Sequence, residues 1–132
     1  MKRLTLICSV ALVTGFGAAC ARSSTDPGGT ACTALAAAGL NLTVVDSLTG
    51  APTALVGLWA RARDGSYTDS SGFIYTDAQT GASRIALAFE HAGTLSVTVH
   101  APGYQEWTKS GVVVTKDVCH VIGVQLTARL VK

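Results

Sequence analysis

The sequence predicts an all-β protein: a single Greek-key β-sandwich of about seven strands, preceded by a targeting segment and a flexible spacer. After residue 40 no window keeps a helical period, whereas apolar and polar residues alternate in short runs, as in strands with one buried face. Clusters of glycine, proline and aspartate separate these runs at a spacing typical of sandwiches. A chain of 132 residues has room for one such domain with a real core.

The clearest strand is expected within Ala92–Tyr104, AGTLSVTVHAPGY, where Leu95, Val97 and Val99 alternate with polar residues. Gly93 opens this run and a Pro-Gly pair closes it, and both are residues that end strands rather than extend them. The run is therefore expected to be a half-buried strand around which the rest of the domain is organised.

The other expected strands follow the same alternation. They are Leu40–Asp46, Ala54–Arg63, Ser66–Thr68, Phe73–Thr76, Arg84–Glu90, Gln105–Ser110, Gly111–Thr115 and Cys119–Val131. The Asp-Gly pair at 64–65 is a strong hairpin signal, so the second and third of these strands are expected to pair. Gly123 is expected to mark a bulge in the last run.

Alternation also assigns side chains to faces within three of these runs. The expected core-facing sets are Val56, Leu58, Ala60 and Ala62 in the second run, Ile85, Leu87 and Phe89 in the fifth, and Val124, Leu126, Ala128 and Leu130 in the last. Trp59, Arg61 and Arg63 are expected on the opposite face of the second run.

The N-terminus has the layout of a secretory signal, because Lys2 and Arg3 precede an uncharged stretch that runs to Cys20. The stretch ends in FGAAC and resembles the lipobox of bacterial lipoproteins, in which the cysteine is acylated and becomes the first residue of the mature chain. Gly17 stands where that motif usually has leucine. Cleavage after Ala21 and a permanent uncleaved anchor are the alternatives.

The lipobox resemblance divides the chain into a lipoprotein signal peptide (1–19), a lipidated cysteine with a flexible linker (20–31) and the sandwich (32–132). Acyl chains such as palmitate on Cys20 would tether the domain to a membrane. Ala21 follows the cysteine where aspartate would signal retention, which resembles lipoproteins sorted to an outer membrane. We therefore expect an exported, monomeric cell-envelope protein on the periplasmic or surface face of that membrane.

The remaining cysteines predict a disulfide. Cys8 lies in the apolar stretch and Cys20 is the acylation candidate, which leaves Cys32 and Cys119 as a pair in an oxidising compartment. Cys119 is expected at the start of the last strand, so the bridge would join the beginning of the domain to its closing strand. Two free buried thiols are the alternative, and no CxxC spacing suggests a metal.

No catalytic or cofactor motif is found. His91, His100 and His120 lack metal-ligand spacing, and the chain has no GxSxG elbow, P-loop or paired carboxylates. Without Lys2 and Arg3, eight basic residues balance eight acidic ones, so nothing points to nucleic acid. We expect a protein that is not an enzyme and has no cofactor.

Three aromatic residues, Trp59, Tyr104 and Trp107, form a candidate ligand face, because exposed rings on a β-sandwich can stack on sugars or anchor a protein partner. The alternative is that these rings line or cap the core. Two functions remain open: a structural or protein-interaction module, which we favour, and a carbohydrate-binding module.

The turn motifs resemble a known family. VDSLTGAP (45–52), DGSY (64–67), GF (72–73), GTLSVTV (93–99) and APGY (101–104) resemble the carboxypeptidase regulatory-like domain, a transthyretin-like (prealbumin-like) sandwich, and the likeness covers Leu40–Thr115. It implies a non-catalytic module. The fold also resembles 5-hydroxyisourate hydrolase, but Thr43 stands where that enzyme has histidine, and its C-terminal Tyr-Arg-Gly-Ser is absent. A hydrolase is therefore not expected.

Overall fold

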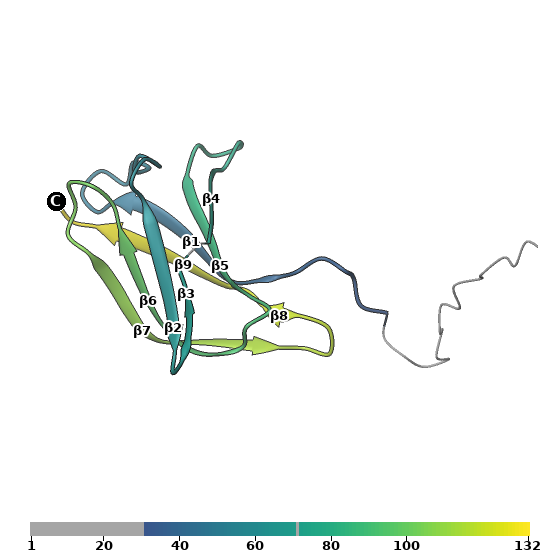
Figure 1. Cartoon of the computed structure of the whole chain (residues 1–132). Coiled ribbons are helices and arrows are strands. Elements are labelled where there is room, and N and C mark those ends of the chain that lie inside the picture. The colour runs from purple at the N-terminus through teal and green to yellow at the C-terminus, as the bar shows by residue number, and fades with distance from the viewer. Residues whose placement is uncertain (1–30, 71) are drawn as a thin grey trace, which may run out of the picture.

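Strand β1 (Ala38–Asp46) lies inside one of two sheets and pairs antiparallel with one neighbour and parallel with the other (Figure 1). The computed structural model describes residues 31–70 and 72–132; the expected signal peptide, Cys8 and the candidate acylation site Cys20 lie outside the described residues. The strands within them are β1 (Ala38–Asp46), β2 (Trp59–Asp64), β3 (Tyr67–Asp69), β4 (Phe73–Thr76), β5 (Ser83–Phe89), β6 (Gly93–His100), β7 (Trp107–Lys116), β8 (Val121–Ile122) and β9 (Val124–Leu130).

The strands form the two layers of a sandwich, which confirms the predicted all-β class. One sheet has the order β4-β5-β1-β9 and the other β3-β2-β6-β7-β8. Strand β1 pairs antiparallel with β5 and parallel with β9, while β2 and β3 form the expected antiparallel hairpin. The described residues contain nine strands rather than about seven, because the short β3, β4 and β8 pair separately.

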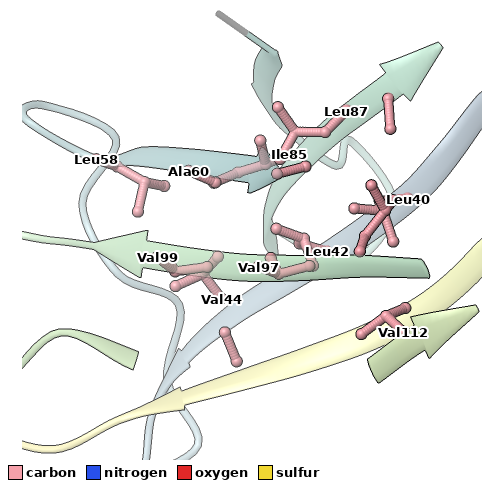
Figure 2. Packing of buried hydrophobic residues seen from close by; sticks show 14 of the residues in the cluster. Leu40, Leu42, Val44, Leu58, Ala60, Ile85, Leu87, Val97, Val99 and Val112 are labelled. Atoms are coloured by element: carbon pink, nitrogen blue, oxygen red, sulfur yellow. The ribbon is translucent and has the colours of Figure 1, made fainter. Parts of the chain in front are cut away.

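The core lies between the two sheets. Leu40, Leu42 and Val44 of β1 are fully buried and face Val97 and Val99 of β6 across the sandwich (Figure 2). Burying a side chain of this size contributes about 1.5 to 3 kcal/mol. The core-facing side chains of each strand therefore hold the two sheets together.

Strand β6 follows the predicted alternation, since Leu95, Val97 and Val99 are buried and Thr94 and Ser96 are exposed. Its neighbour β7 differs from the prediction because it is one strand rather than two.

Leu95 pairs with Val112 and Val97 with Lys109, so β7 carries one extra residue between these pairs. Gly111 adopts a φ of 71° there, a left-handed conformation that suits a glycine bulge. Gly111 therefore bends one strand and does not separate two.

Two predicted faces were wrong at strand ends. Val56 is 86% exposed because β2 begins only at Trp59, after a turn in which Gly57 has a φ of 76°. In β5 both Ala86 and Ala88 are buried with the expected residues, whereas Phe89 is 42% exposed. Ala88 has a φ of 55°, and this left-handed residue reverses the alternation before Phe89.

The last predicted strand is divided at Gly123 between the two sheets. Strand β8 pairs with β7, and β9 pairs with β1 in the other sheet, so Gly123 is a crossing point and the predicted bulge was wrong. A Cβ atom at Gly123 would lie 2.7 Å from the carbonyl oxygen of Ala38, which explains the need for glycine. The expected inward set of β9 is confirmed: Ala128 and Leu130 are buried, and Val124 and Leu126 pack against the core.

The strand directions give the domain two ends. We call the end at which residues 31–37 lead into β1 the proximal end, and the opposite end the distal end (Figure 1). The proximal end holds the connections at 65–66, 90–92 and 117–120, and the distal end holds those at 47–58, 77–82 and 101–106 together with residues 131–132.

Candidate functional site

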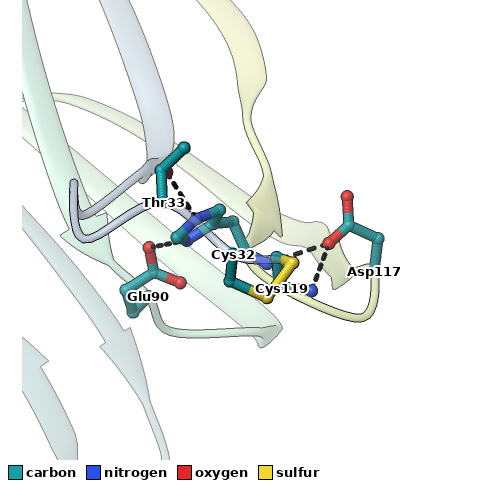
Figure 3. Close-up of a disulfide and its surroundings, with 6 residues drawn as sticks. Cys32, Thr33, Glu90, Asp117 and Cys119 are labelled. Atoms are coloured by element: carbon teal, nitrogen blue, oxygen red, sulfur yellow. Dashed lines mark hydrogen bonds and ion pairs between the residues drawn. A yellow bond between two sulfur atoms is a disulfide. The ribbon is translucent and has the colours of Figure 1, made fainter. Parts of the chain in front are cut away.

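The predicted disulfide is confirmed and lies at the proximal end. Cys32 bonds to Cys119 with a Cα–Cα distance of 5.3 Å, and the bridge closes a sequence separation of 87 residues (Figure 3). Cys119 does not begin the last strand as expected. It lies in the 117–120 turn between β7 and β8, because the final run is divided at Gly123.

A network of hydrogen bonds lies beside this bridge. His120 Nδ1 lies 2.8 Å from Glu90 Oε1, and His120 Nε2 lies 3.0 Å from the Thr33 hydroxyl (Figure 3). Glu90 also accepts a hydrogen bond from the Ala37 amide. That bond, followed by the bond with His120, holds the pKa of Glu90 below its ordinary value. The turn itself is fixed by Asp117 Oδ1, which accepts hydrogen bonds from the two amides that follow it at 119 and 120.

The three histidines lie in three different settings. His91 stacks on Tyr67 with ring centroids 3.5 Å apart and approaches Asp64, whereas His100 stacks on Trp59. His120 belongs to the network beside the disulfide. Within residues 31–70 and 72–132 no group of three or more metal-ligating side chains comes together.

A second polar cluster, formed by Asp46, Tyr104 and Lys132, lies at the distal end. The Tyr104 hydroxyl donates to Asp46 Oδ2 at 3.0 Å, and Lys132 Nζ lies 3.3 Å from the same oxygen. The other carboxylate oxygen accepts the amides of Leu48 and Thr49, each at 2.9 Å.

These contacts define what Asp46 can do. The hydrogen bond from the Thr49 amide, with help from the Tyr104 hydroxyl, holds the pKa of Asp46 well below its usual range. Both oxygens are occupied by donors, so this carboxylate fixes the turn after β1 and is poorly placed to act as a general base. A cavity of about 340 Å³ lies beside it, lined by Asp46, Ser47, Leu48, Thr49, Val131 and Lys132.

The predicted face of Trp59, Tyr104 and Trp107 is not one face. Trp59 pairs with His100, whereas Trp107 pairs with the buried Val99. Successive residues of a strand point to opposite sides, so Trp59 is on the outer face of its sheet and Trp107 on the core side. Tyr104 and Trp107 pack against the core, which agrees with the alternative reading for those two rings.

The Trp59 ring already has partners. Its centroid lies 5.3 Å from that of His100, and the Arg61 guanidinium lies 5.1 Å from the ring centroid. A ring stacked in this way offers less surface to a sugar than an isolated tryptophan would.

The sequence reasoning missed an aromatic pair on β4. Phe73 and Tyr75 have ring centroids 5.3 Å apart and are 65% and 37% exposed. Both rings lie on the outer face, because the residue between them, Ile74, pairs with buried Ile85. The Phe-x-Tyr spacing inside an expected strand was the signal that could have found them.

Large apolar side chains are exposed at both ends. At the distal end Leu48 is 92%, Val56 86% and Val131 51% exposed. At the proximal end Leu35 is 79% and Val118 83% exposed. In the described part of the chain, no helix is long and apolar enough to cross a membrane.

Comparison with known proteins found no match to this chain among protein-family models, curated proteins or solved structures. The resemblance to the carboxypeptidase regulatory-like domain therefore stays a prediction that rests on the turn motifs.

Proposed function

We propose that this protein is a non-catalytic, lipid-anchored β-sandwich of the cell envelope that binds a protein partner through its distal end. The observation that carries the proposal is the exposure of Leu48, Val56 and Val131 at the end opposite to the one where the tether would arrive. Large apolar side chains exposed at one end of a domain are candidates for an interaction site.

The distal surface is held firmly, which favours binding. The Gln105 amide donates to the carbonyl of Val131 at 2.7 Å, and the Ser47 amide donates to the carbonyl of Leu130 at 2.8 Å. A Cβ on Gly57 would lie only 2.6 Å from the Pro102 ring, so those two loops are in close contact. Because the loops are already ordered, the free energy of binding includes little cost for ordering them.

Export and anchoring are supported by independent features of the chain. The disulfide between Cys32 and Cys119 is typical of an oxidising compartment. The lipobox-like FGAAC segment supplies the candidate acylation site at Cys20, and residues 21–31 are rich in small and polar residues, as a spacer would be. The proposed location is the periplasmic or surface face of an outer membrane.

We also propose membership of the carboxypeptidase regulatory-like family. Two of the motifs that suggested it form turns at the distal end. DSLTGAP forms the turn after β1 that Asp46 organises, and APGY forms the corner between β6 and β7. Tyr104 of that corner donates to Asp46, so the two motifs support each other in space.

Photo-crosslinking in cells tests the partner. A photoreactive residue at position 48 should yield a protein adduct, whereas the same residue at Thr94, an exposed position on β6, should yield none. Absence of an adduct at position 48, or equal adducts at both positions, would contradict the proposal. Cys20→Ser should release the protein from membranes. Unchanged retention of this variant by membranes would contradict the proposed lipid anchor.

Carbohydrate binding is a second candidate, favoured by Phe73 and Tyr75 rather than by the aromatic residues first predicted. Two neighbouring exposed rings on one sheet face can stack on sugar rings. The Phe73→Ala/Tyr75→Ala variant should then lose cosedimentation with envelope polysaccharide at unchanged thermal stability. Cosedimentation equal to that of the unsubstituted protein would exclude this site.

A further inference from the structure

The proximal end carries a second group of exposed apolar side chains. We call Leu35, Val113, Val118 and Ile122 the proximal apolar patch; they are 79%, 59%, 83% and 55% exposed, respectively. They come from the segment before β1, from β7, from the 117–120 turn and from β8.

The disulfide and the strand register bring these residues to the same region. Cys32 bonds to Cys119, which follows Val118 directly, and Leu35 lines a shallow hollow of about 320 Å³ together with Cys119. Ile122 pairs with Thr115 of β7, so it is a diagonal neighbour of Val113 on the outer face of the sheet.

The carboxylates beside the patch are hydrogen-bonded within the domain and do not cover its apolar side chains. Asp117 Oδ1 is occupied by backbone amides, and Glu90 by His120 and the Ala37 amide. Lys116 is exposed at the end of β7, on the side of the strand opposite to Val113.

We propose that the proximal apolar patch rests on a lipid surface, an inference that depends on the tether at Cys20 proposed above. Residues 1–30 contain the apolar run that ends in FGAAC, and they join the domain at this end. The chain from Cys20 to Cys32 can extend no further than about 40 Å, so a tethered domain remains within reach of the bilayer.

This confinement favours contact because tethering raises the effective concentration of a weakly binding surface. Apolar side chains of the patch enter the boundary between headgroups and acyl chains. The distal end then points away from the bilayer, toward the partner proposed above.

Fluorescence quenching by brominated lipids tests the orientation. Full-length protein purified from membranes is reconstituted into phosphatidylethanolamine–phosphatidylglycerol vesicles whose acyl chains carry bromine. In a Val118→Trp variant the added fluorescence should fall about twofold, because an interfacial ring lies about 5 to 10 Å deep. The matched control is Leu48→Trp, whose added fluorescence should be unaffected.

The native rings give a low background, because Trp59 and Trp107 both lie toward the distal end. Val118 and Leu35 are exposed, so substitutions there should not disturb the core, and thiol titration of each variant checks that the disulfide has formed. Leu35→Trp provides an independent second probe.

Quenching at positions 118 and 35 but not at 48 supports the inference. A Val118→Trp ring that brominated lipid does not quench, in protein that stays membrane-bound, overturns it while leaving the tether intact. So does equal quenching at positions 118 and 48. A protein that is not retained by membranes at all refutes the proposed tether instead.

Discussion

Replacing both Cys32 and Cys119 by serine should destabilise the domain strongly, because the bridge closes a long loop. With a sequence separation of 87 between the two cysteines, the loop-closure relation gives an entropy loss of about 15 cal/mol/K in the unfolded chain. At 25 °C this amounts to about 4.6 kcal/mol, an upper figure because residual structure in the unfolded chain reduces it. For a domain of this size the corresponding fall in Tm is about 20 °C.

The assay is thermal and urea unfolding of the full-length protein in detergent, followed by tryptophan fluorescence and circular dichroism. Dithiothreitol should lower the stability of the unsubstituted protein to that of the double variant and leave the double variant unchanged. A difference of less than about 1 kcal/mol, or equal sensitivity of both proteins to dithiothreitol, would refute the loop-closure argument.

Three further predictions concern the core, the carboxylates and the tryptophans. Leu42→Ala should lower the free energy of unfolding in urea by about 2 to 5 kcal/mol, because Leu42 is fully buried. Leu48→Ala, at a position that is 92% exposed, should change it by no more than about 0.5 kcal/mol. Equal losses in the two variants would contradict the assigned core. The pKa of Glu90 is lowered on folding, so its stabilising effect is present above its ordinary pKa of 4.5 and is lost as the pH falls through the lowered value. Glu90→Gln should therefore reduce the loss of stability as the pH falls below 4.5 in thermal unfolding, and an unchanged pH profile would contradict this. Trp107→Ala should cost about 2 to 3 kcal/mol and Trp59→Ala about 1 kcal/mol, and the reverse order would contradict the assigned faces.

Strand positions could be predicted because alternation is a local property. Leu95, Val97 and Val99 alternate with polar residues, and the structure buries those three in β6. The β2–β3 hairpin was predicted for the same reason, although its two-residue turn is Gly65-Ser66 and Asp64 is the last residue of β2, paired with Tyr67.

Strand ends could not be predicted equally well, because backbone conformation there depends on what the chain meets. The alternation in β5 continues past Ala88 in sequence, but the left-handed Ala88 leaves Phe89 partly exposed. The run through Gly123 looks like one strand, but it is divided where the chain passes Ala38 too closely for a side chain.

The candidate site was predicted only in part. The pairing of Cys32 with Cys119 follows from cysteine count and compartment, and the structure confirms it. The prediction that the three aromatic residues share one face was wrong. Trp59 pairs with His100 of β6 and Trp107 with Val99, and this register puts the two rings on opposite sides of the sheet.

The sequence by itself determined the all-β class, most strand positions and the disulfide, because these depend on local patterning and residue chemistry. The tertiary structure alone decided the parallel pairing of β1 with β9, the single bulged β7 and the contact of Tyr104 with Asp46. It also placed Leu48 and Val118 at opposite ends of the domain. Residues distant in sequence meet only when the sheets pack, so no local pattern encodes which of them become neighbours.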